Sequence, residues 1–110
     1  MGYAYLDYSG VLHITKHKEL AKEYGQKGVY IETDLPAAHG YPVDDYGNFI
    51  IITRDKDSGK FYCRNQEKLG SWVAIYRVIA LYTKLEDSIP ESIVESLIDV
   101  IKSVFRGEFL

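Results

Sequence analysis

The two C-terminal segments of this chain distribute their apolar residues differently. When residues 89–106 are placed on a helix at 100° per residue, their apolar side chains fall into one continuous arc. These side chains are Ile93, Val94, Leu97, Ile98, Val100, Ile101, Val104 and Phe105. Charged residues and serines fill the opposite arc, so the pattern predicts an amphipathic helix that buries one face.

The preceding segment, residues 72–85, is apolar almost all round. Only Arg77 and Lys84, seven residues apart, mark a narrow polar strip along it. A helix with so wide an apolar arc must be covered on two sides, either by its own fold or by another molecule. The connection over residues 84–88 is short, and Ser88 with Glu91 forms a capping box, so we expect the two helices to pack as an antiparallel pair.

Three short turn sequences divide the first two thirds of the chain. Residues 7–10, 45–48 and 57–59 combine Asp, Ser or Asn with a glycine, which is the composition of hairpin turns. The flanking residues are mostly β-branched or aromatic, as strands prefer. The sequence therefore predicts three antiparallel hairpins, which pair 3–6 with 11–15, 41–44 with 49–53, and 50–54 with 60–64.

The segments between these hairpins complete the predicted fold. Residues 16–24 form a short helix with Thr15 as its N-cap and Leu20, Ala21 and Tyr24 as its apolar stripe. Residues 28–35 alternate like a half-buried strand. We therefore expect a single α+β domain over residues 1–110, with an antiparallel or mixed sheet of about five or six strands. The two C-terminal helices should pack against one face of this sheet.

Composition and charge exclude several classes of protein. A chain of 110 residues that is 46% hydrophobic and 26% charged falls in the globular range. Its formal charge of −3 argues against a general nucleic-acid binder. One cysteine allows no internal disulfide and no cysteine-based zinc site, which fits a reducing cytosol. No targeting signal or membrane-spanning apolar run is recognisable, so we expect a cytoplasmic protein with no membrane partner.

The best candidate for a binding site is the irregular segment over residues 36–45, because loops on a rigid sheet commonly carry function. Its candidate residues are His39, Tyr41, Asp44 and Asp45. The histidine and the two aspartates could form a cluster for a metal ion or for proton transfer. Their spacing matches no known ligand pattern, however, and Asp45 is explained as the residue that initiates a turn. We therefore expect no catalytic residue, no metal and no cofactor.

Other side chains have an ordinary structural explanation. His13 lies on the strand face opposite Leu12 and Ile14, as a solvent-facing or partly covered imidazole. His17 belongs to a basic patch with Lys16, Lys18, Lys22 and Lys27, for which a solvated helix face is the commoner interpretation. Cys63 shares a strand face with Phe61 and is expected in the core. The ten tyrosines either form a recognition surface or simply cover an open sheet.

No family motif is recognisable, and the leading hypothesis is a small cytosolic binding or protein-interaction module without catalysis. We expect a homodimer formed through residues 72–85, with Trp72, Tyr76, Ile79 and Tyr82 at the interface. An unidentified protein or small molecule is the expected ligand, and nucleic acid is not. The alternative is a small metal-dependent or acid–base enzyme that uses residues 39–45, and a third hypothesis is a nucleic-acid contact through residues 16–27.

Overall fold

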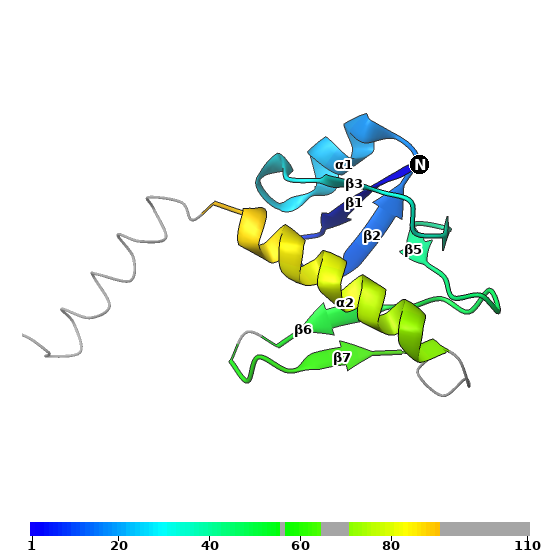
Figure 1. Ribbon diagram of the computed structural model, residues 1–110. Coiled ribbons are helices and arrows are strands. Elements are labelled where there is room, and N and C mark those ends of the chain that lie inside the picture. The colour runs from blue at the N-terminus through cyan, green and yellow to red at the C-terminus, as the bar shows by residue number, and fades with distance from the viewer. Residues whose placement is uncertain (56, 65–70, 91–110) are drawn as a thin grey trace, which may run out of the picture.

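The computed structural model describes residues 1–55, 57–64 and 71–90 (Figure 1). Within these ranges the chain folds as a small α+β protein whose elements follow in this order. They are β1 (Gly2–Leu6), β2 (Leu12–Thr15), α1 (Lys18–Tyr24), the 3₁₀ turn η1 (Gln26–Gly28), β3 (Ile31–Thr33), β4 (Ala37–Ala38), β5 (Tyr41–Pro42), β6 (Ile52–Arg54), β7 (Phe61–Cys63) and α2 (Ser71–Ser88).

The first hairpin forms as predicted and is the centre of the largest sheet. Strands β1 and β2 pair antiparallel, from Tyr3 opposite Thr15 to Leu6 opposite Leu12. Strand β3 adds to the other edge of β1, which gives the order β2-β1-β3. In the turn, Gly10 has a φ of +82°, a conformation that side-chain-bearing residues rarely adopt.

The sheet is divided, whereas we expected one sheet of five or six strands. Beside the three-stranded sheet, the described residues contain two separate pairs, β4 with β5 and β6 with β7. Proline limits the pairing of β4 and β5 with other strands, because it has no N–H to donate to a neighbouring strand. Pro36 lies between β3 and β4, and Pro42 ends β5.

The third predicted hairpin is confirmed, and the second forms only in part. Strands β6 and β7 pair from Ile52 opposite Cys63 to Arg54 opposite Phe61. Of the expected pairing between residues 41–44 and 49–53, a bridge between Val43 and Phe49 forms. The Ile50 amide also donates to the Pro42 carbonyl oxygen at 2.8 Å. On their other edge residues 41–42 pair with residues 37–38, through a two-residue turn that was not predicted.

The helices differ from the predictions mainly at their ends. Helix α1 begins at Lys18 with His17 at the N-cap, while the expected cap residue, Thr15, accepts a hydrogen bond from the His17 amide through Oγ1 at 3.1 Å. Of its predicted apolar stripe only Ala21 is buried. Helix α2 continues to Ser88, so the expected connection over residues 84–88 is helical instead. Ile89 and Pro90 follow it as non-helical residues, and the remainder of the predicted helix 89–106 lies outside the described residues.

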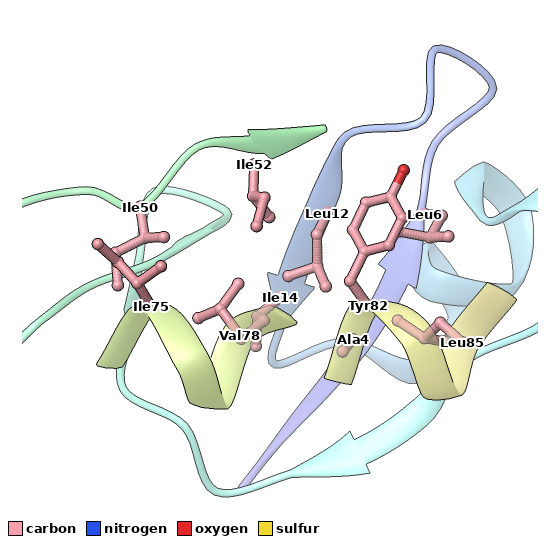
Figure 2. Close-up of a cluster of buried hydrophobic side chains, with 10 residues drawn as sticks. All are labelled: Ala4, Leu6, Leu12, Ile14, Ile50, Ile52, Ile75, Val78, Tyr82 and Leu85. Atoms are coloured by element: carbon pink, nitrogen blue, oxygen red, sulfur yellow. The ribbon is translucent and has the colours of Figure 1, made fainter. Parts of the chain in front are cut away.

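The core lies between α2 and one face of the strands. Helix α2 crosses both the three-stranded sheet and the β6–β7 pair, as Figure 1 shows. Figure 2 shows the side chains that meet there: Ala4, Leu6, Leu12, Ile14, Ile50, Ile52, Ile75, Val78, Tyr82 and Leu85. Within the described ranges, no helix is long and apolar enough to cross a membrane.

The opposite face of the three-stranded sheet carries aromatic and polar residues. Along β1 the buried residues alternate with the half-buried Tyr3 and Tyr5. Helix α1 packs near this second face, and a side chain on Gly25 would come within 3.1 Å of the Tyr5 Cβ atom. The tyrosines here therefore cover sheet surface that the core does not use.

Candidate functional site

The β4–β5 turn is the most unusual local structure near the predicted loop. Its two central residues, His39 and Gly40, have φ values of +52° and +84°. A two-residue hairpin with positive φ at both central positions is a type I′ turn, for which Asn-Gly is the favoured sequence. Histidine therefore occupies a position where asparagine is the more usual residue.

A hollow of about 350 Å³ lies beside this turn. We call it the β4–β5 hollow, and Lys16, His17 and His39 are among its polar lining residues. Ile14, Leu35 and Ala37 are among its apolar lining residues. The N-terminus, the end of β2 and the β4–β5 hairpin gather at this end of the molecule (Figure 1). The fold thus places His39 of the predicted loop and His17 of the predicted basic patch at the same hollow, a proximity that the sequence analysis missed.

A row of rings runs from the sheet to the tip of the hairpin. The His13 ring stacks on Tyr5 with a centroid distance of 5.2 Å, and it also lies 5.0 Å from the Tyr41 ring. Tyr41 contacts Phe49 at 6.2 Å, and Phe49 contacts His39 at 6.0 Å. Two residues of the predicted binding loop, His39 and Tyr41, are therefore connected through one aromatic cluster.

Asp7 and His13 form a hydrogen-bonded pair at the inner end of this row. The His13 Nε2 atom lies 2.7 Å from the Asp7 Oδ2 atom, and the His13 side chain is only 17% exposed. Burial alone would raise the pKa of the Asp7 carboxyl, but hydrogen bonds from the Val11 amide, His13 and the Ser9 amide outweigh it, so the pKa lies below its ordinary value. The carboxylate is therefore ionised at neutral pH.

This pair was absent from the sequence predictions, although the hairpin contains a signal for it. Tyr5 is opposite His13 in the register, and Asp7 lies on the same strand face two residues beyond Tyr5. Diagonal neighbours of this kind are within reach of long or polar side chains. The register of the predicted hairpin would have placed the carboxylate beside the imidazole.

The geometry favours a structural role for His13 over a catalytic one. In the described part of the chain, its hydrogen-bond partner is Asp7, and no serine, threonine or cysteine hydroxyl or thiol bonds to it.

Burial raises the pKa of the Cys63 thiol, which donates to the Arg64 carbonyl oxygen at 3.2 Å. A protonated thiol is a weak nucleophile.

Asp44 and Asp45 have different surroundings. Asp44 is buried, and its Oδ1 atom accepts hydrogen bonds from the Tyr46 and Asn48 amides, both at 2.9 Å. Asp44 therefore initiates the turn, a role that the sequence analysis assigned to Asp45, which is exposed. Across residues 1–55, 57–64 and 71–90, no group of three His, Cys, Asp or Glu side chains has a geometry that could hold a metal ion.

The residues predicted for a protein interface separate into two groups. Trp72 and Tyr76 are 51% and 65% exposed, and Val73 between them is 71% exposed. We call these three residues the α2 strip. Ile79 packs against the core, and Tyr82 is buried in it, with its hydroxyl donating to the Gly10 carbonyl oxygen at 2.6 Å. Tyr82 is thus covered by its own chain.

Comparison with protein-family models, with curated proteins and with solved structures finds no match to this chain.

Proposed function

We propose that this chain is a small cytosolic interaction module without catalysis of its own, and that it self-associates through the α2 strip. The observation that carries the proposal is the exposure of Trp72, Val73 and Tyr76 on consecutive turns of one helix face. The other face of α2 is already occupied, because Ile75 and Val78 pack into the core. Contiguous exposed apolar residues on a small protein commonly mark an interaction surface.

The composition of this surface resembles that of protein interfaces. Trp72 lies beside Tyr76, with a ring-centroid distance of 6.4 Å, and Arg77 follows on the same exposed side. Tryptophan, tyrosine and arginine are the residue types most enriched where interfaces derive their binding energy. Within its own chain Arg77 has an exposed ion pair with Asp34, at 3.5 Å. Such a pair stabilises the fold little, so Arg77 can exchange this partner at low cost.

A second copy of this chain fits the strip because the strip can pair with itself. If two α2 helices cross antiparallel between Val73 and Tyr76, each of these residues lies opposite the other in the second copy. The same crossing brings Trp72 of each chain to the partner's Arg77, where an arginine can stack on the indole face. The two-fold symmetry forms every such contact twice.

The enzyme alternative is less well supported. It requires His39, Asp44 and Asp45 to act together, and the Asp44 carboxylate accepts hydrogen bonds from its own turn. The remaining imidazole–carboxylate pair, His13 with Asp7, is mostly covered by neighbouring rings. Binding is therefore the better proposal for this fold.

Light scattering of the full chain at micromolar concentration tests the proposal. The wild-type protein is expected at twice its chain mass of 12.6 kDa. Tyr76→Asp should shift it to the monomer mass, because a charge in a pairing apolar surface cannot be solvated. Arg77→Ala should weaken the dimer if Arg77 stacks on the partner's Trp72.

Tyr46→Asp is the matched control. Tyr46 is 68% exposed, like Tyr76, but it lies in a turn of the β5–β6 connection. This variant should remain dimeric. A wild-type protein that is monomeric over the whole concentration range would refute the proposal, and so would a dimer that Tyr76→Asp leaves intact.

A further inference from the structure

The β4–β5 hollow is lined by several side chains that can donate hydrogen bonds. Lys16, His17 and His39 supply an ammonium group and two imidazoles to its lining. Thr15 and Thr33 also line it, and each hydroxyl already accepts a backbone hydrogen bond, from the amides of His17 and Leu35. Each hydroxyl therefore keeps its own hydrogen to donate.

One acidic side chain, Asp34, also lines this hollow. Its side chain is 87% exposed, and its Oδ1 atom lies 3.5 Å from the Arg77 guanidinium, so water and Arg77 screen its charge. The remaining lining is partly apolar and includes Ile14, Leu35 and Ala37. A ligand with an anionic group and a small apolar body would match both parts of the hollow.

The backbone at His39 gives a second, independent reason to look for a ligand here. Its φ of +52° lies in the left-handed region, in a turn where asparagine is favoured. Residues other than glycine that are held at positive φ cluster at ligand sites. His39 is one of the residues that line the hollow, and its ring also contacts Phe49 at 6.0 Å.

We propose that the β4–β5 hollow binds a small organic anion. The carboxylate or phosphate group is held by Lys16, His17 and His39, with the Thr15 hydroxyl as a further donor, and the apolar body lies against Leu35 and Ala37. A volume of about 350 Å³ is at the lower end for ligand sites, which suits a small molecule and not a nucleic-acid strand. None of the three α2 strip residues lines this hollow.

The experiment is an amide NMR titration of the full chain with benzoate, phenyl phosphate and benzyl alcohol. All three probes carry the same ring, so they differ mainly in the charge and type of the polar group. The anions should shift the amide signals of His17, His39 and Gly40 and reach saturation at millimolar concentration. Benzyl alcohol should bind at least about tenfold more weakly, because it lacks the charge that strengthens these hydrogen bonds. The two anions distinguish a carboxylate ligand from a phosphate ligand.

His39→Asn is the decisive variant, because it keeps the turn and removes the imidazole. It should weaken anion binding by about tenfold. Lys60→Gln is the matched control, since Lys60 is an exposed cation next to β7, and it should leave the affinity unchanged. Absence of saturable shifts would overturn the proposal. So would equal binding of benzyl alcohol, or an unchanged affinity in His39→Asn.

Discussion

Aspartates determine several turns of this protein through one recurring arrangement. Asp7 Oδ1 accepts hydrogen bonds from the amides of Ser9 and Val11, two and four residues later. Asp44 Oδ1 does the same with Tyr46 and Asn48. Asp55 accepts from the amide two residues later, at 3.0 Å. In each case the carboxylate satisfies amides that the turn leaves without a strand partner.

Asp7 should make the stability of the protein depend on pH. Asp7→Asn keeps an acceptor for the two turn amides but loses the charge that faces His13. We expect it to lower the free energy of unfolding by about 1 kcal/mol at pH 7. Because the folded pKa of Asp7 is lowered, its contribution is complete above the unfolded value of about 3.9 and is lost as the pH falls through the folded pKa.

Urea unfolding of the wild type and Asp7→Asn at neutral and at strongly acidic pH measures this effect. The difference between the two proteins should narrow as the pH falls below about 4. A difference that stays constant across this range would mean that the Asp7 charge does not stabilise the fold.

His39 should make the fold less stable than an asparagine at the same position would. In His39→Asn the new residue adopts positive φ more readily, and the favoured Asn-Gly turn is created. We expect the free energy of unfolding to rise by up to about 1 kcal/mol. The measurement is the denaturant midpoint of both proteins. A clear loss of stability would show that the imidazole contributes more through its contact with Phe49 than the turn loses through strain.

At the scale of elements, local signals predicted more than long-range ones. The β1–β2 and β6–β7 hairpins and the central part of α1 could be predicted, because turn residues and alternation act over a few neighbouring positions. The alternation over residues 28–35 is also present, with Glu32 and Asp34 exposed and Ile31 half-buried, although the strand itself spans only Ile31–Thr33.

The remaining elements could not be predicted because their partners are not encoded locally. Residues 41–42 had two available partner segments, and the His39-Gly40 turn, which lacks the usual asparagine, gave a weak signal. The candidate site could not be predicted for the same reason. His17 and His39 are brought to one hollow by the packing of β2 against the β4–β5 turn, where the Ile14 amide donates to the Gly40 carbonyl oxygen at 3.0 Å.

Tyr82 connects α2 to the first hairpin, and its hydroxyl can be tested separately from its ring. Tyr82→Phe removes the 2.6 Å hydrogen bond to the Gly10 carbonyl but keeps the ring in the core. We expect a loss of about 1–2 kcal/mol in the free energy of unfolding. Tyr62→Phe is the control, because Tyr62 is 56% exposed, and it should change little. Denaturant unfolding of the wild type and the variants measures this loss. Equal denaturant midpoints for the wild type and Tyr82→Phe would show that the hydrogen bond to Gly10 does not stabilise the fold.

At the scale of the whole molecule, α2 has two faces with different roles. One face packs on both groups of strands and closes the core (Figure 2). The other face begins with the α2 strip and continues with the exposed Ala80 and Lys84. The sequence predicted that residues 72–85 need cover on two sides. The described residues supply that cover for the face that contains Ile75, Val78, Tyr82 and Leu85.

Fluorescence of Trp72 measures the proposed self-association most directly. Trp72 is the single tryptophan of the chain and belongs to the α2 strip, so its emission reports on that surface alone. If a second copy covers the strip, the emission maximum should move to shorter wavelength as protein concentration rises, because pairing removes the indole from water. Tyr76→Asp should keep the long-wavelength emission at every concentration. An emission maximum of the wild-type protein that does not change with concentration, from the nanomolar to the high micromolar range, would contradict the account.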